Sequence, residues 1–275
     1  MGTMLFDARI CIRGAGDLAS GVALKLYRCG FRRLLMTETT YPLAVRRMVS
    51  FCEAIHEGVW EVEGVRSQRA ETLSEAFRAW DEHAIPVMVD PENTVSHEYR
   101  PEIIVDAIMA KRNIGTAMSQ ADLVIALGPG FEAGRDAHAV VETHRGHNLG
   151  RIIWEGSAFP DTGVPGDIGG KTAQRVLRAP ADGVFESTMH IGALVREGAA
   201  VGHVAGVPVI SKIDGVLRGL IRPGTFVAHG LKIGDVDPRG EISYCFSVSD
   251  KARAIAGGVL EAVLAHCYEK HRRPS

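Results

Sequence analysis

The chain has 275 residues, 46% of them hydrophobic, which is enough to build one large domain or two modest ones and excludes a disordered chain. Its 31 Lys and Arg residues nearly balance 33 Asp and Glu residues, so no net field draws it onto nucleic acid or an anionic membrane. No run approaches the roughly 18 apolar residues of a membrane span. The five cysteines form no Cys-x-x-Cys pair and fit a reduced compartment, so we expect a cytoplasmic protein.

The first forty residues predict a strand-turn-helix-strand unit. The apolar run over 9–12 is typical of a buried strand, and residues 18–27 have the apolar spacing of a helix that Gly30 would end. A second apolar run over 33–37 ends at Glu38. This order is typical of one half of a doubly wound α/β sheet.

The pattern continues to about residue 137. It predicts helices over 44–48 and 71–83, an extended stretch over 59–65, and strands over 85–89, 103–106 and 123–127. These strands and the first two predict a parallel sheet of four or five strands. We therefore expect residues 1–137 to form a Rossmann-like nucleotide-binding domain in an α/β protein.

Glycine becomes frequent after residue 137, and an internal repeat follows. Asp182-Gly183-Val184 recurs 32 residues later as Asp214-Gly215-Val216, and the same offset relates Gly192 to Gly224. The repeat predicts that residues 138–240 form a small two-fold β-sandwich. It resembles the lipoyl and biotinyl carrier domains but lacks their modified lysine, so no covalent lipoyl or biotin group is expected. Residues 241–275 are predicted to form a C-terminal helix that packs on the first domain.

A glycine motif opens the predicted first helix. Gly14, Ala15, Gly16, Asp17 and Ala19 fit the pattern G-x-G-x-x-G/A, in which small residues let a pyrophosphate approach a helix N-terminus. Glu38 stands at the end of the next strand, where an acid holds a ribose hydroxyl. We expect a nucleotide site here, the alternative being a tight turn that binds nothing.

Further candidates follow other predicted strands. Arg46, Arg47 and Ser50 suit a phosphate, because a guanidinium group grips two oxygens at once; the alternative is a solvated helix face. Four more candidates stand at the carboxyl edge, where open α/β sheets bind ligands. They are Asp106, Lys111, Gly128 and Gly130. The two glycines either bound a ligand crevice or only end the sheet.

Metal binding and catalysis have weaker signals. Glu142, His144 and His147 form the pattern Glu-x-His-x-x-His, which contains residue types that divalent metals prefer. The alternative is a set of polar strand residues at the domain boundary. No nucleophile elbow, P-loop or Ser-His-Asp set is present, so no catalytic residue is assigned.

Five segments together resemble the YqeB family, and they cover nearly the whole chain. They are residues 12–21, 44–54, 127–131, 142–147 and 215–221. Members of this family are associated with selenium-dependent molybdenum hydroxylases and with their maturation. The resemblance therefore implies a molybdenum hydroxylase apoprotein as partner. A more distant resemblance is to XdhC-type molybdenum cofactor chaperones, whose separate N-terminal domain has no obvious counterpart here.

Three functions remain open on this basis. The first is a maturation or assembly factor for molybdenum hydroxylases that binds a nucleotide-bearing ligand, either the molybdopterin dinucleotide form of the molybdenum cofactor or NAD(P). The second is an NAD(P)-dependent oxidoreductase acting on a small substrate, in which Glu38 would favour NAD over NADP. The third is a non-catalytic protein-binding scaffold. The sequence leaves the oligomeric state open, a homo-oligomer included.

Overall fold

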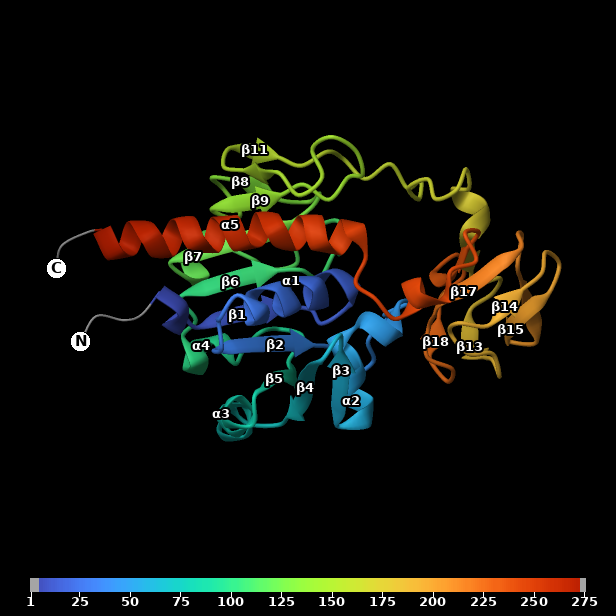
Figure 1. Ribbon diagram of the computed structural model, residues 1–275, viewed down its shortest axis with the longest axis horizontal. Helices are drawn as coiled ribbons and strands as arrows, with labels where there is room; N and C mark the ends of the chain where they lie inside the picture. The colour runs from blue at the N-terminus through green and yellow to red at the C-terminus, as the bar shows by residue number, and fades with distance from the viewer. Residues whose placement is uncertain (1–4, 273–275) are drawn as a thin grey trace. The chain divides into compact units, whose positions relative to one another are not determined.

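The computed structural model describes residues 5–272, which fold as two compact units (Figure 1). The first unit contains the chain up to Thr40, Phe51–Asp161 and the chain from Val248 onward, and the second contains Tyr41–Ser50 and Thr162–Ser247. The chain therefore leaves the first unit and returns to it twice. Among the described helices, none combines the length and apolar character that a membrane crossing requires.

A nine-stranded sheet forms the centre of the first unit, in the order β10-β9-β7-β6-β1-β2-β5-β4-β3. The strands are β1 Ile10–Arg13, β2 Leu34–Glu38, β3 Val59–Val62, β4 Val65–Ala70, β5 Ala84–Val89, β6 Ile103–Asp106, β7 Leu123–Leu127, β9 Ala139–Val141 and β10 Ile152–Ile153. Those from β9 to β4 are parallel, whereas β10 and β3 pair antiparallel at the two edges. The segments that follow the parallel strands therefore share one edge of the sheet.

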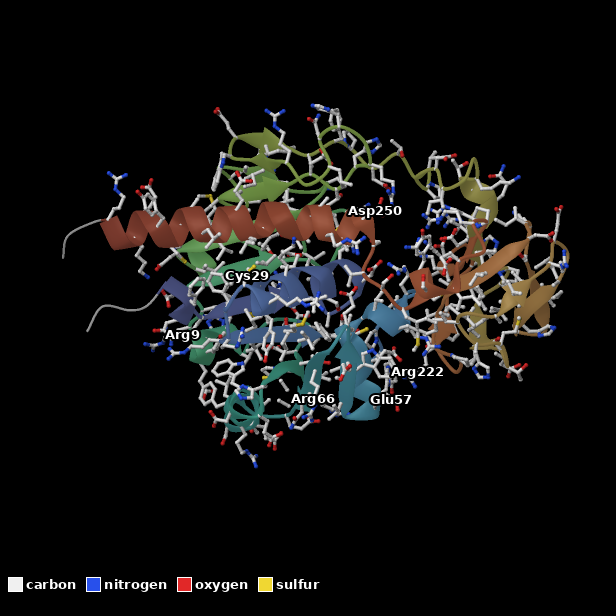
Figure 2. The ribbon with its side chains drawn as sticks, in the orientation of Figure 1. Arg9, Cys29, Glu57, Arg66, Arg222 and Asp250 are labelled. Atoms are coloured by element: carbon white, nitrogen blue, oxygen red, sulfur yellow. The ribbon has the colours of Figure 1, made fainter. Side chains whose placement is uncertain are left out.

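Helices and a small second sheet complete the first unit. They are α1 Asp17–Arg28, α2 Ala54–Glu57, α3 Leu73–Asp81, α4 Ser96–Tyr99 and α5 Asp250–Arg272, with β8 Glu132–Ala133 paired to β11 Gly156–Ser157. The long helix α5 lies beside α1 (Figure 1), and a Cβ atom on Gly21 would lie only 2.9 Å from the Cβ of Ala252. Asp250, labelled in Figure 2 at the start of α5, accepts hydrogen bonds from Arg145 at 2.7 and 3.0 Å.

The second unit consists of two four-stranded antiparallel sheets, β12-β19-β17-β14 and β16-β15-β13-β18. The strands are β12 Val176–Arg178, β13 Gly183–Glu186, β14 Leu194–Val195, β15 Ala200–Val204, β16 Val207–Ile210, β17 Gly215–Leu220, β18 Phe226–Val227 and β19 Lys232–Asp237. Strands of the two copies of the repeat pair with each other: β13 of the first copy pairs with β18 of the second, and β14 of the first pairs with β17 of the second. Phe185, Leu217 and Val236 are buried together in the core of this unit.

The predicted fold class, a Rossmann-like parallel sheet domain plus a lipoyl- or biotinyl-like β-sandwich, is wrong. The sheet is mixed and has nine strands instead of four or five parallel ones. The extended stretch over 59–65 begins the hairpin β3–β4, and no α-helix joins β6 to β7 or β7 to β9. The second unit also takes in Tyr41–Ser50 and strand β12, which precedes the repeat, so the repeat alone does not make the unit. Within 44–48, only a 3₁₀ turn at Arg47–Val49 forms.

Two half-buried histidines, His138 and His266, make the stability of the first unit depend on pH. The Nδ1 atom of His138 accepts a hydrogen bond from the Val124 N–H at 2.9 Å, so the bond requires the neutral ring. Burial lowers the pKa of His138 below 6.5, against an opposing effect of Asp122. Burial and then Lys270 lower the pKa of His266, whereas Asp122 and Glu102 oppose this shift.

We expect stability to fall as the pH falls below about 6.5, because the unfolded chain then binds more protons than the folded one. Above that pH both histidines are neutral in either state and this contribution is fully present. Urea unfolding at several pH values between about 5 and 8 checks the direction. His138→Gln keeps a neutral acceptor for Val124 and should weaken the pH dependence, whereas His144→Gln at an exposed position should not. Equal pH dependence in His138→Gln would contradict this explanation.

Candidate functional site

The glycine motif forms the turn from β1 into α1. Gly14 has φ +93°, a conformation that residues with a side chain rarely adopt, and its N–H donates to the Thr37 carbonyl at 2.7 Å. A Cβ atom here would lie 3.1 Å from the Ala107 carbonyl oxygen. Gly16 is the N-cap of α1, and no atom lies within 4 Å of the position of its missing Cβ. The turn is therefore closed at Gly14 and open at Gly16.

Glu38 reaches this turn from the end of β2. One carboxylate oxygen accepts the Ala15 N–H at 2.9 Å, and the other accepts the Thr39 N–H at 2.8 Å. Each oxygen retains a further lone pair, and the side chain is half-buried. The structure thus brings the predicted ribose-binding acid against the predicted phosphate turn.

The N-terminus of α1 faces this turn without a capping side chain. Its first N–H groups have no acceptor within the helix, and the helix dipole adds partial positive charge there. Asp17 lies in the first turn of α1, whereas Ala15 and Ala19 are buried. The two alanines act through their small size, because they let the turn and the helix pack closely.

Asp106 lies in a buried network beside the turn. Its Oδ2 atom accepts the Thr116 hydroxyl at 2.5 Å and lies 3.5 Å from Arg13 Nη1. Its Oδ1 atom accepts the Ile108 N–H at 3.1 Å, and Arg13 also donates to the Thr116 hydroxyl. Sequence reasoning singled out Asp106 but missed Arg13 and Thr116. These contacts indicate a role in fixing the segment after β6.

The segments after β6, β7 and β9 pack against one another at the same edge. Gly130 has φ +101°, and a Cβ atom there would lie 2.6 Å from the Arg112 Cα atom. Gly128 has φ +74°, and its Cβ would overlap Thr143. Lys111 is exposed and pairs with Asp161 at 2.7 Å. Close packing therefore requires both predicted glycines, against backbone at Gly130 and against the Thr143 side chain at Gly128.

Arg46, Arg47 and Ser50 belong to the second unit, unlike the glycine turn. Arg46 is buried and donates to the carbonyl oxygens of Tyr244 at 2.9 Å and Ser247 at 2.8 Å. The Arg47 Nε atom donates to the Leu220 carbonyl oxygen at 2.8 Å, and Ser50 Oγ donates to the Arg46 carbonyl oxygen at 2.9 Å. These three residues hold the 41–50 segment within its own unit.

The predicted metal ligands do not converge. Glu142 is buried, and its two carboxylate oxygens accept the N–H groups of His144 at 2.6 Å and Phe159 at 2.8 Å. His144 and His147 are both exposed. Among the described residues, no three His, Cys, Asp or Glu side chains are grouped as a metal site would need. Glu142 instead closes the loop that runs from β9 to Phe159.

Residues 142–160, which include β10 and β11, line an open pocket of about 480 Å³ within the first unit. Its lining includes Glu142, Asn148, Arg151, Trp154, Glu155 and Phe159. The side chains of Trp154 and Phe159 are 52% and 55% exposed, so half of each aromatic surface is uncovered. Sequence reasoning missed Arg151, Trp154 and Phe159; the only signal was the proximity of two aromatic residues to the Glu-x-His-x-x-His segment.

No protein-family model matches the chain. The similarity to solved structures is weak, as three of them show. They are a succinylglutamate desuccinylase/aspartoacylase from Rhodobacter sphaeroides (TM-score 0.27, 16% identity, 84% of this chain and 85% of that one), a protein named TcdA (CsdL) (0.38, 14%, 98% and 90%) and the Escherichia coli tRNA N6-threonylcarbamoyladenosine dehydratase TcdA (0.35, 12%, 98% and 90%). At these TM-scores the similarity supports no argument on fold or function.

The sequence comparison is far stronger. The chain is 49% identical over 255 residues to a protein of Escherichia coli (strain K12) named "Uncharacterized protein YqeB", and the match covers 93% of this chain. The chain spans about half of the length of that relative, 47%. Since the match includes nearly every element described above, the chain belongs to the YqeB family.

Proposed function

We propose that this chain is a maturation factor for molybdenum hydroxylases that binds a nucleotide-bearing ligand at the turn between β1 and α1. The observation behind this proposal is the contact between the Glu38 carboxylate and the Ala15 N–H, at 2.9 Å, beside the uncapped N-terminus of α1. It joins an acceptor for hydroxyl groups to a site that favours a phosphate. A ribose phosphate needs both.

Different residues bind the phosphate and the ribose of the ligand. The first N–H groups of α1 donate to phosphate oxygens, and the open space at Gly16 admits the phosphate. The free lone pairs of Glu38 accept ribose hydroxyls, and its charge repels a phosphate on the ribose, which favours NAD over NADP. A molybdopterin dinucleotide or NAD fits this division. The resemblance to the YqeB family supports a hydroxylase apoprotein as the partner that receives the ligand.

Gly16→Trp tests the phosphate position. Gly16 has φ −73° and ψ −171°, which any residue adopts, and open space for a side chain. We therefore expect a folded protein that loses at least about 90% of its bound nucleotide, because the indole occupies the phosphate position and one lost interaction of about 1.4 kcal/mol is a factor of ten. Gly16→Ala is the matched control and should retain most of the ligand.

The protein is purified from a host that makes molybdenum cofactor, denatured, and assayed for oxidised pterin fluorescence and for nucleotide. Pterin at near-stoichiometric level, reduced in Gly16→Trp, supports the proposal. Release of nucleotide without pterin favours an NAD(P)-dependent oxidoreductase. Release of no pterin and no nucleotide favours a scaffold. Undiminished hydroxylase maturation by Gly16→Trp in cells would show that the turn is not the functional site.

A further inference from the structure

The open pocket lined by residues 142–160 has the features of a second binding site, and we propose that it binds a planar heterocycle presenting two neighbouring N–H donors. The 2-amino-4-oxo-pyrimidine edge shared by guanine and pterins has this donor pattern. This inference goes beyond the proposed function, because it concerns different residues from the turn between β1 and α1. It is argued from the lining of the cavity alone.

Glu142 supplies the acceptors. It is 2% exposed and lies in the cavity lining. Each of its oxygens accepts one backbone N–H, from His144 and from Phe159, and each has room for a second donor. Among the described residues, Glu142 forms no ion pair. A buried carboxylate stabilised only by neutral donors gains from two further N–H groups in its plane.

The walls suit a flat ring. Trp154 and Phe159 line the cavity and leave about half of their aromatic surface uncovered. Aromatic faces of this kind stack on heterocyclic bases. The volume, about 480 Å³, is within the ordinary range of small-molecule sites.

Charge favours a neutral ring over an organic cation. Arg151 and Glu155 are both exposed in the lining and offset each other, so the charge of Glu142 is the one buried charge among these side chains. An ammonium group would lose its own hydration before it reached Glu142, whereas a neutral N–H edge loses much less. Arg151 can in addition contact a phosphate carried by the sugar.

Calorimetric titration of the purified chain with guanosine, inosine, adenosine and unsubstituted pterin tests the donor pattern. Guanosine has two adjacent donors, inosine has one, and adenosine presents an acceptor beside its amino group. We expect guanosine to bind at least about tenfold tighter than adenosine, with inosine between them, because each charge-assisted hydrogen bond contributes appreciably. Nucleosides without phosphate keep this result separate from the phosphate position at Gly16.

Two variants locate the site. Trp154→Ala removes an exposed ring and should weaken guanosine binding about tenfold, whereas Tyr268→Ala, at an aromatic side chain 58% exposed on α5, should not. Glu142→Gln should abolish the preference for guanosine over adenosine. If Glu142→Gln unfolds the 142–160 segment, the effect of Trp154→Ala on guanosine binding still tests the site.

The two ligand sources are distinguished in the same experiment. If pterin binds tightly and guanosine does not, the site is assigned to a pterin. If guanosine binds tightly and pterin does not, it is assigned to a guanine nucleoside. Either result supports the donor pattern. Equal binding of all four compounds, tighter binding of tetramethylammonium, or no effect of Trp154→Ala would overturn the proposal. Gly16→Trp should leave guanosine binding unchanged, so the two proposals fail independently.

Discussion

Asp106→Ala is expected to lower the free energy of unfolding of the first unit by about 3–5 kcal/mol. The substitution leaves the Arg13 guanidinium, which is 3% exposed, without its carboxylate partner. It also removes the acceptor of the Thr116 hydroxyl and of the Ile108 N–H. The penalty arises mainly from the buried charge that remains, since a surface ion pair of the same length contributes little.

Urea unfolding followed by circular dichroism measures this loss. Asp122→Ala is the matched control: this carboxylate is 60% exposed and lies 3.2 Å from Lys270, so its removal should cost less than about 1 kcal/mol. Asp106→Asn keeps an acceptor but no charge and should fall between the two. A loss in Asp106→Ala no larger than that in Asp122→Ala would show that the network contributes little.

The sequence predicts the centre of the first sheet well, and the physical reason lies in burial. Strands β6 and β7 are buried along their whole length, so they are continuous apolar runs bounded by polar or glycine residues. The turn at Gly14–Gly16 and the end of β2 at Glu38 come together because β1 and β2 are parallel neighbours. That part of the candidate site follows from local pattern and strand adjacency alone.

The edges of the sheet could not be predicted in the same way. Strands β9 and β10 contain three and two residues, too few to show a periodicity. Four of the six residues of strand β4 are polar, and its buried and exposed residues do not alternate strictly. Its place beside β5 depends on pairing across helix α3. The prediction of a small parallel sheet failed because a local sequence pattern does not indicate which further strands extend the sheet at its edges.

The cavity and the arginines of the second unit escaped prediction for a related reason. Arg46 and Arg47 donate to backbone carbonyl oxygens roughly 170–200 residues away, and no residue pattern reveals such acceptors. Likewise, the loop that brings Trp154 and Phe159 to Glu142 is closed by carboxylate-to-backbone hydrogen bonds. The residue types were visible in the sequence, but their partners were not.

Gly150→Ala is expected to destabilise the first unit by about 2–5 kcal/mol, from two separable causes. Gly150 has φ +82°, which costs a residue with a side chain about 1–2 kcal/mol. Its Cβ atom would in addition lie 2.5 Å from the Ala254 carbonyl oxygen in α5. Gly134→Ala isolates the first cause, because Gly134 has φ +89° and nothing within 4 Å of its Cβ position.

The difference between these two variants in urea unfolding therefore measures how tightly the loop after β9 is held against α5. The Gly150 N–H donates to the Glu142 carbonyl oxygen at 2.9 Å, so a displaced Gly150 also displaces the residue that supplies the acceptors of the cavity. We expect Gly150→Ala to weaken guanosine binding more than Gly134→Ala. Equal stability of the two variants would mean that α5 yields to the added methyl group and that the close approach at Gly150 does not fix the position of this segment.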